Sequence, residues 1–129
     1  TAPIMDVIGY GDPVVTKGLN MLYGPGNDLV SATAMTAAGA HLILFSTGRG
    51  TPFSAPAPTL KISTNTPLAE KKGGWIDFNT GVIADGEKTI DEAARDLLDL
   101  VIRVAGGEQT KAEKHGFREI SIFKDGVVL

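Results

Sequence analysis

Residues 42–50, LILFSTGRG, indicate how this chain folds. The uninterrupted apolar run at 42–45 is typical of a strand buried in a parallel sheet, and the glycines that follow mark a loop. Residues 60–63, LKIS, form a second candidate strand with an alternating pattern. Because helical patterns lie between the strand candidates, the sequence predicts an α/β fold, a layered Rossmann-like domain with a mainly parallel sheet flanked by helices.

Helices are predicted at residues 29–38, 67–72 and 90–105. The last has the clearest signal, because apolar residues recur every three or four positions to give one broad face, and Thr89 with Glu92 forms a capping box. Further strand candidates are residues 19–23, 75–78 and 119–123, the last followed by a turn at 125–126. Residues 3–17 are predicted to be irregular.

Composition and length describe an ordinary globular chain. The 129 residues fit a single domain, 1–129, with 43% hydrophobic and 21% charged residues. The formal net charge of -3 argues against a general nucleic-acid binder. The absence of cysteine excludes disulfides, cysteine zinc sites and thiol catalysis. No apolar run reaches the roughly 20 residues of a membrane span, so a cytoplasmic location is expected.

Four polar loops are expected to meet beyond the carboxyl ends of the parallel strands, where such sheets bind ligands. These loops are residues 24–28, 47–51, 64–67 and 79–81, all rich in glycine, asparagine and threonine. Their hydroxyl and amide groups suit a polyhydroxylated ligand. Two of them open predicted helices, whose N-termini attract anions.

Arg49 is the main candidate for anion binding, because a guanidinium matches a carboxylate or phosphate with paired hydrogen bonds. The predicted substrate-binding residues are Asn27, Asp28, Thr47, Gly48, Arg49, Gly50 and Asn65. Structural alternatives stay open for several of them. Asn27 and Asp28 are also good helix caps, Asn65 could fix a turn, and Arg49 alone could be a solvated surface residue.

Catalytic and metal-binding motifs are missing from the sequence. The two histidines, His41 and His115, have no ligand-like spacing, and no metal ligand is predicted within this chain. No G-x-S-x-G elbow, G-x-G-x-x-G loop or P-loop pattern occurs. The residues alone therefore predict a site for an anion and a polyol without an evident catalytic base.

Residues 18–81 strongly resemble the C-terminal portion of the altronate/galactarate dehydratase family. The ordered motifs GPGND, TGRGTP, KISTNT and DFNTG carry this resemblance. The final stretch, HGFREISIFKDGVVL, is similar too, and looks closer to the altronate branch than to the galactarate or sulfolactate branches.

The resemblance implies a carbon-oxygen lyase that removes water from D-altronate, or galactarate, to give a 2-keto-3-deoxy acid. It implies a divalent metal, iron or manganese, in the full-length enzyme, with none fully ligated by this portion. Family members are several times longer, and this sequence begins at Thr1 without methionine. We therefore expect a C-terminal piece that is inactive without the remaining N-terminal part of the enzyme.

Alternative functions from other classes remain. The same loops would suit a non-catalytic α/β module that binds a phosphorylated sugar or a nucleotide. The domain could also supply a homo-oligomer interface, with Arg49 holding a partner loop. No partner of nucleic-acid or membrane type is expected, and the catalytic residues are unassigned.

Overall fold

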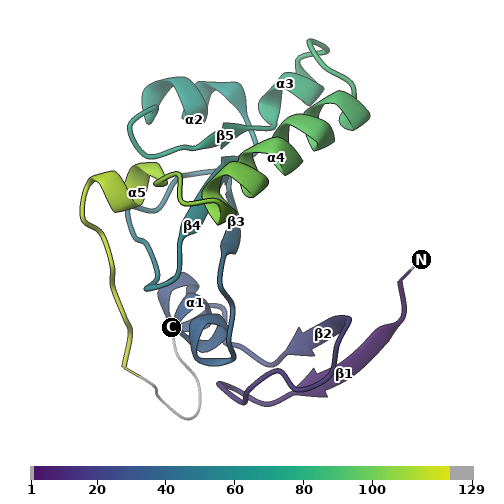
Figure 1. The fold of residues 1–129 in the computed structure, drawn as a ribbon. Helices are drawn as coiled ribbons and strands as arrows, with labels where there is room; N and C mark the ends of the chain where they lie inside the picture. The colour runs from purple at the N-terminus through teal and green to yellow at the C-terminus, as the bar shows by residue number, and fades with distance from the viewer. Residues whose placement is uncertain (1, 123–129) are drawn as a thin grey trace.

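The computed structural model describes residues 2–122. Figure 1 labels the elements, which in chain order are β1 (Ile4–Ile8), β2 (Leu19–Leu22), α1 (Asp28–Ala37), β3 (Ile43–Thr47), β4 (Thr59–Ser63), α2 (Thr66–Lys71), β5 (Phe78–Asn79), α3 (Gly81–Ala84), α4 (Ile90–Ala105) and α5 (Lys111–Lys114). Strands and helices are interleaved along the chain, which confirms the predicted α/β class.

The strands of this range form two small parallel sheets rather than one continuous sheet. β3, β4 and β5 are hydrogen-bonded in the order β3-β4-β5, and β1 pairs separately with β2. The predicted parallel pairing is therefore confirmed, although β2 and β3 do not pair. β4 is the central strand of its sheet, and every one of its residues is buried.

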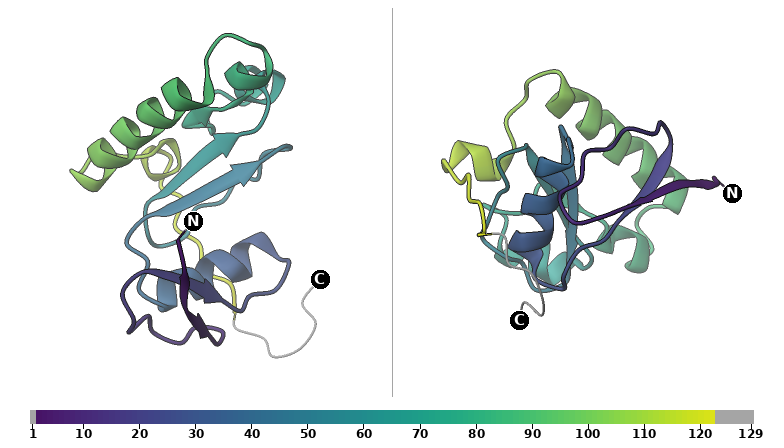
Figure 2. Two further views of the ribbon diagram at one scale, coloured as in Figure 1. Left: turned by 90° about the vertical axis from the view of Figure 1, so that its right-hand side faces the viewer. Right: turned by 90° about the horizontal axis from the view of Figure 1, so that it is seen from below.

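The three-stranded sheet lies between α4 and α1, as the left view of Figure 2 shows. An apolar layer covers the sheet on each of these two sides. On one side, Leu60 packs with Leu100 and Val104 of α4. On the other side, Ile43 packs in a cluster with Ala32 of α1 and with Phe53. Because full burial of one large aliphatic side chain contributes about 1.5–3 kcal/mol, these two layers hold the sheet in place.

α4 begins where the sequence predicts. The Thr89 N–H donates to Glu92 Oε2 at 2.8 Å, and the Glu92 N–H donates to Thr89 Oγ1 at 3.3 Å. These two bonds complete the capping box. The hydrogen bond from the Thr89 backbone is the largest cause of the lowered pKa of the Glu92 carboxyl, followed by the bond from the Thr89 hydroxyl.

Only part of the broad apolar face of α4 contacts the core. The helix buries Ala93, Leu100 and Val104. Three large apolar side chains on the same helix, Ile90, Leu98 and Ile102, stay mostly exposed. The sequence pattern thus located the helix correctly. It did not indicate which apolar residues of the helix pack on the sheet and which remain exposed.

Two predictions near the chain ends are wrong. Residues 4–8 are not irregular but form β1, because their backbone pairs in parallel with that of β2. Residues 119–122 form no strand, since their backbone makes isolated bonds instead of a ladder. The Glu119 N–H donates to the Ser54 carbonyl at 2.8 Å, and the Ser121 N–H donates to Thr33 Oγ1 at 3.0 Å. Residue 123 and the predicted turn at 125–126 lie outside the described residues.

Short elements account for the remaining differences. β5 begins at Phe78 rather than at residue 75, and the single-turn helices α3 and α5 were not predicted. α5 nevertheless has a local signal, a capping box between Thr110 and Glu113. Within residues 2–122, no helix combines the length and apolar character needed to cross a membrane.

Candidate functional site

The loop after β3 carries Arg49 and is shaped by its own threonine. Thr47 Oγ1 accepts hydrogen bonds from the backbone N–H of Arg49 at 3.3 Å and of Gly50 at 2.9 Å. Gly50 has a φ of +79°, a left-handed backbone conformation that residues with a Cβ rarely adopt. The two amide groups are therefore used inside the loop rather than offered to an anion.

Two lysine side chains hold the carbonyl groups of the same loop. Lys72 Nζ donates to the Arg49 carbonyl at 2.9 Å and to the Gly50 carbonyl at 3.2 Å. Lys61 Nζ donates to the carbonyl of Thr51. Hydrogen bonds from a charged donor are roughly twice as strong as those from a neutral one. The backbone of residues 49–51 is consequently fixed from the carbonyl side as well.

The Arg49 side chain is left free by all these contacts. Arg49 is exposed, and its hydrogen bonds within residues 2–122 involve only its backbone N–H and carbonyl. The ion pairs of that range lie elsewhere, between Lys88 and Asp96 and between Arg103 and Glu108. A guanidinium without a partner, on a loop that is held on both sides, is a ready donor for a planar anion.

The loops after β4 and β5 join the Arg49 loop at one edge of the sheet. Asn65 Nδ2 donates to the Gly48 carbonyl at 3.2 Å. The Thr80 N–H donates to the Ser63 carbonyl at 2.9 Å. The carboxyl ends of these three parallel strands therefore meet, as predicted for three of the four loops, at the edge where α/β sheets bind ligands. The fourth loop, residues 24–28, follows β2 of the other sheet.

Asn65 uses both ends of its side chain within the protein. Its Oδ1 accepts from the Leu68 N–H at 2.9 Å and caps α2, while its Nδ2 is bound to Gly48. The turn-fixing alternative is therefore what the structure shows for Asn65. A contact between Asn65 and a ligand stays a prediction.

Asn27 and Asp28 connect α1 with the same region. Asn27 Oδ1 accepts from the Val30 N–H at 3.2 Å, which confirms its alternative interpretation as a helix cap. Asp28 is the first residue of α1, and its Oδ2 accepts a hydrogen bond from Thr51 Oγ1 at 3.4 Å. The structure thus places Asp28 in contact with the Arg49 loop, while the Asn27 side chain caps α1.

Lys61 and Lys72 were not among the predicted site residues. The alternating pattern of LKIS identified it only as a candidate strand, and in the structure Lys61 is 1% exposed. A central parallel strand is covered on both faces, so alternation says little about exposure there. Desolvation by burial lowers the pKa of Lys61 to about 8, although Asp77 and Glu119 act in the opposite direction. A lysine in the middle of an apolar strand was the signal available in the sequence.

Metal ligands do not gather in the described part of the chain. Among residues 2–122, no group of three or more histidine, aspartate or glutamate side chains is placed to hold a metal ion. His41 and His115 are both exposed, and His115 stacks loosely on Phe117 with ring centroids 6.0 Å apart. These donors do not fit a divalent metal site made by this range alone.

Comparison with known protein families gives a match over nearly the whole chain. Residues 1–128 match the family described as D-galactarate/Altronate dehydratase, C-terminal. The matched range includes all residues of the candidate site, which lies in the loops after β3, β4 and β5. The candidate site is therefore part of the domain that this family describes.

Three curated relatives are similar to this chain. An altronate dehydratase from Bacillus subtilis (strain 168) is 46% identical over 128 residues, 99% of this chain and 26% of the relative. An altronate dehydratase from Escherichia coli (strain K12) is 47% identical over 126 residues, 98% of this chain and 25% of the relative. A galactarate dehydratase (L-threo-forming) from Escherichia coli (strain K12) is 34% identical over 128 residues, which cover 97% of this chain and 24% of the relative. The chain therefore spans about a quarter of the length of these relatives.

Proposed function

We propose that this chain, which belongs to the D-galactarate/altronate dehydratase family as its C-terminal domain, supplies a substrate-binding edge to a sugar-acid dehydratase. The proposed reaction is the removal of water from D-altronate to give a 2-keto-3-deoxy acid, with galactarate as the second candidate substrate. D-altronate is placed before galactarate because the chain is more similar to the relatives named altronate dehydratase than to the one named galactarate dehydratase. Residues 1–129 then act as a single α/β domain.

The observation that carries the proposal is the guanidinium of Arg49 at the carboxyl edge of the three-stranded sheet, which has no partner within residues 2–122. A sugar acid offers one planar carboxylate and several hydroxyl groups. The carboxylate matches the two parallel N–H donors of a guanidinium. Thr47 and Gly48 hold the loop in place, and Asp28 lies within hydrogen-bond reach of it as an acceptor for a sugar hydroxyl.

The proposed role follows from the chemistry of dehydration. Taking the proton next to a carboxylate moves negative charge onto that carboxylate in the transition state. A fixed cation at the same place stabilises the transition state more than the ground state, and this difference accelerates the reaction. The guanidinium of Arg49 stays protonated throughout, so it serves as an electrostatic clamp and not as the general acid or base.

The remaining parts of the active site are proposed to come from the portion that the relatives carry outside the matched quarter. The described residues do not fit a divalent metal, so the role proposed for them involves no contact with the iron or manganese that the resemblance implies. We accordingly expect no turnover of D-altronate by the chain alone. A cytoplasmic location and an assembly of several copies are further proposals, which cell fractionation and light scattering would test.

Binding of D-altronate to the chain, followed by backbone amide shifts in NMR, tests the proposal. We expect shifts at residues 47–51 and 64–66, and weaker binding in Arg49→Ala by about tenfold or more, the usual effect of losing a charged hydrogen-bond pair. Arg95→Ala is the matched control, because Arg95 is an equally exposed arginine that lies on α4.

Other ligands decide between the candidate functions. Stronger binding of galactarate than of D-altronate would move the substrate assignment to the galactarate branch. Shifts with a phosphate ester and none with either sugar acid would contradict the dehydratase role and support a phosphate-binding module. If Arg49→Ala changed the number of copies in the assembly but left binding intact, the arginine would serve an interface instead.

A further inference from the structure

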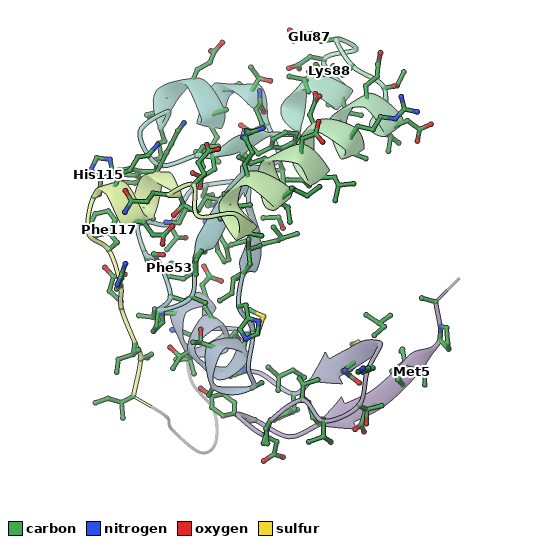
Figure 3. The ribbon with its side chains drawn as sticks, in the orientation of Figure 1. Met5, Phe53, Glu87, Lys88, His115 and Phe117 are labelled. Carbon is green, nitrogen blue, oxygen red and sulfur yellow. The ribbon has the colours of Figure 1, made fainter. Side chains whose placement is uncertain are left out.

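Lys61 places a charged group in the apolar interior beneath the Arg49 loop. It stands in the central strand β4, opposite Phe45 of β3, and its side chain is 1% exposed. Its Nζ lies 5.0 Å from the ring centroid of Phe53, which packs edge-on against Phe45 at 5.1 Å. Phe53 is labelled in Figure 3. A buried ammonium is costly unless it is bonded, so its one polar contact decides its role.

That contact is the Thr51 carbonyl at the end of the Arg49 loop. The carboxylates that act on Lys61 are engaged elsewhere. Asp77 accepts from the backbone N–H of Lys61 and of Lys111, each at 2.8 Å. Glu119 accepts from the Ser54 N–H at 2.9 Å. Within residues 2–122, therefore, the ammonium group of Lys61 is hydrogen-bonded to the loop and forms no ion pair with a carboxylate.

The loop is thus held by two ammonium groups with different surroundings. Lys72, at the end of α2, is half-buried, binds the carbonyls of Arg49 and Gly50, and lies over the ring of Trp75 at 5.1 Å. Lys61 binds the next carbonyl, that of Thr51, from inside the core. Because Lys61 is buried, its side chain cannot touch a ligand bound by the Arg49 guanidinium. Lys61 therefore affects ligand binding only through its hydrogen bond to the loop backbone.

We propose that Lys61 is a positioning residue, whose ammonium group fixes the residue 49–51 backbone so that Arg49 meets the substrate carboxylate. This inference rests on the proposed function in one respect, the identity of the ligand as a sugar acid. The fixing of the loop by Lys61 concerns the free chain and needs no ligand.

The electrostatics give this role a pH signature. Burial lowers the pKa of Lys61 from 10.5 to about 8, with Asp77 and Glu119 partly opposing the shift. The ammonium form is therefore present below about pH 8 and is lost as the pH rises through that value. A neutral amine forms a weaker hydrogen bond with the Thr51 carbonyl, so the loop should loosen over this range. The carboxylate of a sugar acid is ionised throughout this range, so its own titration does not contribute to the step.

The first experiment follows the amide shifts of residues 48–51 in the free chain as the pH is raised through the pKa of Lys61. We expect these amides to titrate together near pH 8 in the wild type and in Lys72→Met, and not in Lys61→Met. Lys71→Met, which removes an exposed lysine at the end of α2, is the matched control and should titrate like the wild type. Unchanged amide shifts in α4 would show that each variant is folded.

The second experiment measures the affinity for D-altronate over the same pH range. Wild-type affinity should fall by about tenfold above pH 8, because only a fraction of the loops then hold Arg49 in the binding conformation. Lys61→Met should bind weakly at every pH, with no step near pH 8. A role limited to stability would lower the melting temperature without creating this pH step.

The outcomes separate the two proposals. Loop amides that do not titrate near pH 8 in the wild type, or that titrate equally in Lys61→Met, overturn the role of Lys61 even if D-altronate binds. A Lys61-dependent titration without binding of any sugar acid keeps the positioning contact and rejects the proposed ligand. If Lys61→Met does not fold, the wild-type titration and Lys61→Gln, which retains a neutral donor, decide the question in its place.

Discussion

The two sheets of this chain share parallel pairing but differ in how completely they are covered. All residues of β4 are buried, whereas Ile4, Val7 and Leu19 in β1 and β2 are 57%, 73% and 49% exposed. Met5, labelled in Figure 3, lies on β1 away from α4 and the three-stranded sheet. Parallel strands are usually covered on both faces, and in the described part of this chain β4 is the one strand that is buried along its whole length. The candidate site is therefore built beside the best-covered strand of the described residues, whereas the two-stranded sheet leaves more of its apolar surface exposed.

Shortening a leucine in each sheet tests this contrast with the largest expected effect. Leu60→Ala removes a fully buried side chain that packs against α4, and should lower the free energy of unfolding by about 3 kcal/mol. Leu19→Ala in β2 should lower it by less than about 1 kcal/mol, since the side chain is half exposed. Urea denaturation of both variants measures the difference. Equal losses would mean that the two sheets are equally important for stability.

A glycine at the candidate site should give the next largest effect. A Cβ at Gly81 would stand 2.2 Å from the Thr66 backbone nitrogen, so Gly81→Ala forces the first residues of α3 and α2 apart. We expect a loss of about 2 kcal/mol in the free energy of unfolding. Gly74→Ala is the control, because a Cβ there meets nothing within 4 Å. A Gly81→Ala variant as stable as Gly74→Ala would contradict the described packing at this edge.

Removing single hydroxyl groups should distinguish the two regions by a smaller amount. Thr89→Ala deletes the cap of α4, which covers the three-stranded sheet, and should lower the melting temperature by the equivalent of about 1 kcal/mol. Thr16→Ala deletes a partly buried bond to Asp6 beside the two-stranded sheet, and should cost less than about 0.5 kcal/mol. The reverse order would show that the two-stranded region stabilises the fold more than its burial suggests.

Local signals in the sequence were sufficient for most of the fold around the site. Caps, proline at a helix start and three-to-four periodicity placed α1, α2 and α4 within one or two residues. The loop carrying Arg49 was predicted from the glycines that follow an apolar run. Residues 4–8 were missed because the glycines and proline just after them dominated the local pattern.

The contacts that hold the site could not be read from local patterns. Lys72 reaches the Arg49 carbonyl across 23 positions, and Lys61 reaches Thr51 across 10. Such contacts depend on which strand becomes central and how α2 returns over the sheet edge. For the same reason, the sequence offered Asn65 as a turn residue or a ligand contact, and the structure was needed to show its bonds to Leu68 and Gly48.

The most direct test of the central claim pairs a change in the ligand with a change in the protein. Affinities of the wild type and of Arg49→Ala would be measured for D-altronate and for its carboxamide, which keeps the hydroxyl groups but loses the negative charge. The wild type should prefer the acid by about tenfold or more, and Arg49→Ala should bind both compounds with equal, weak affinity. If Arg49→Ala still preferred the acid as strongly as the wild type does, Arg49 would not be the group that binds the carboxylate.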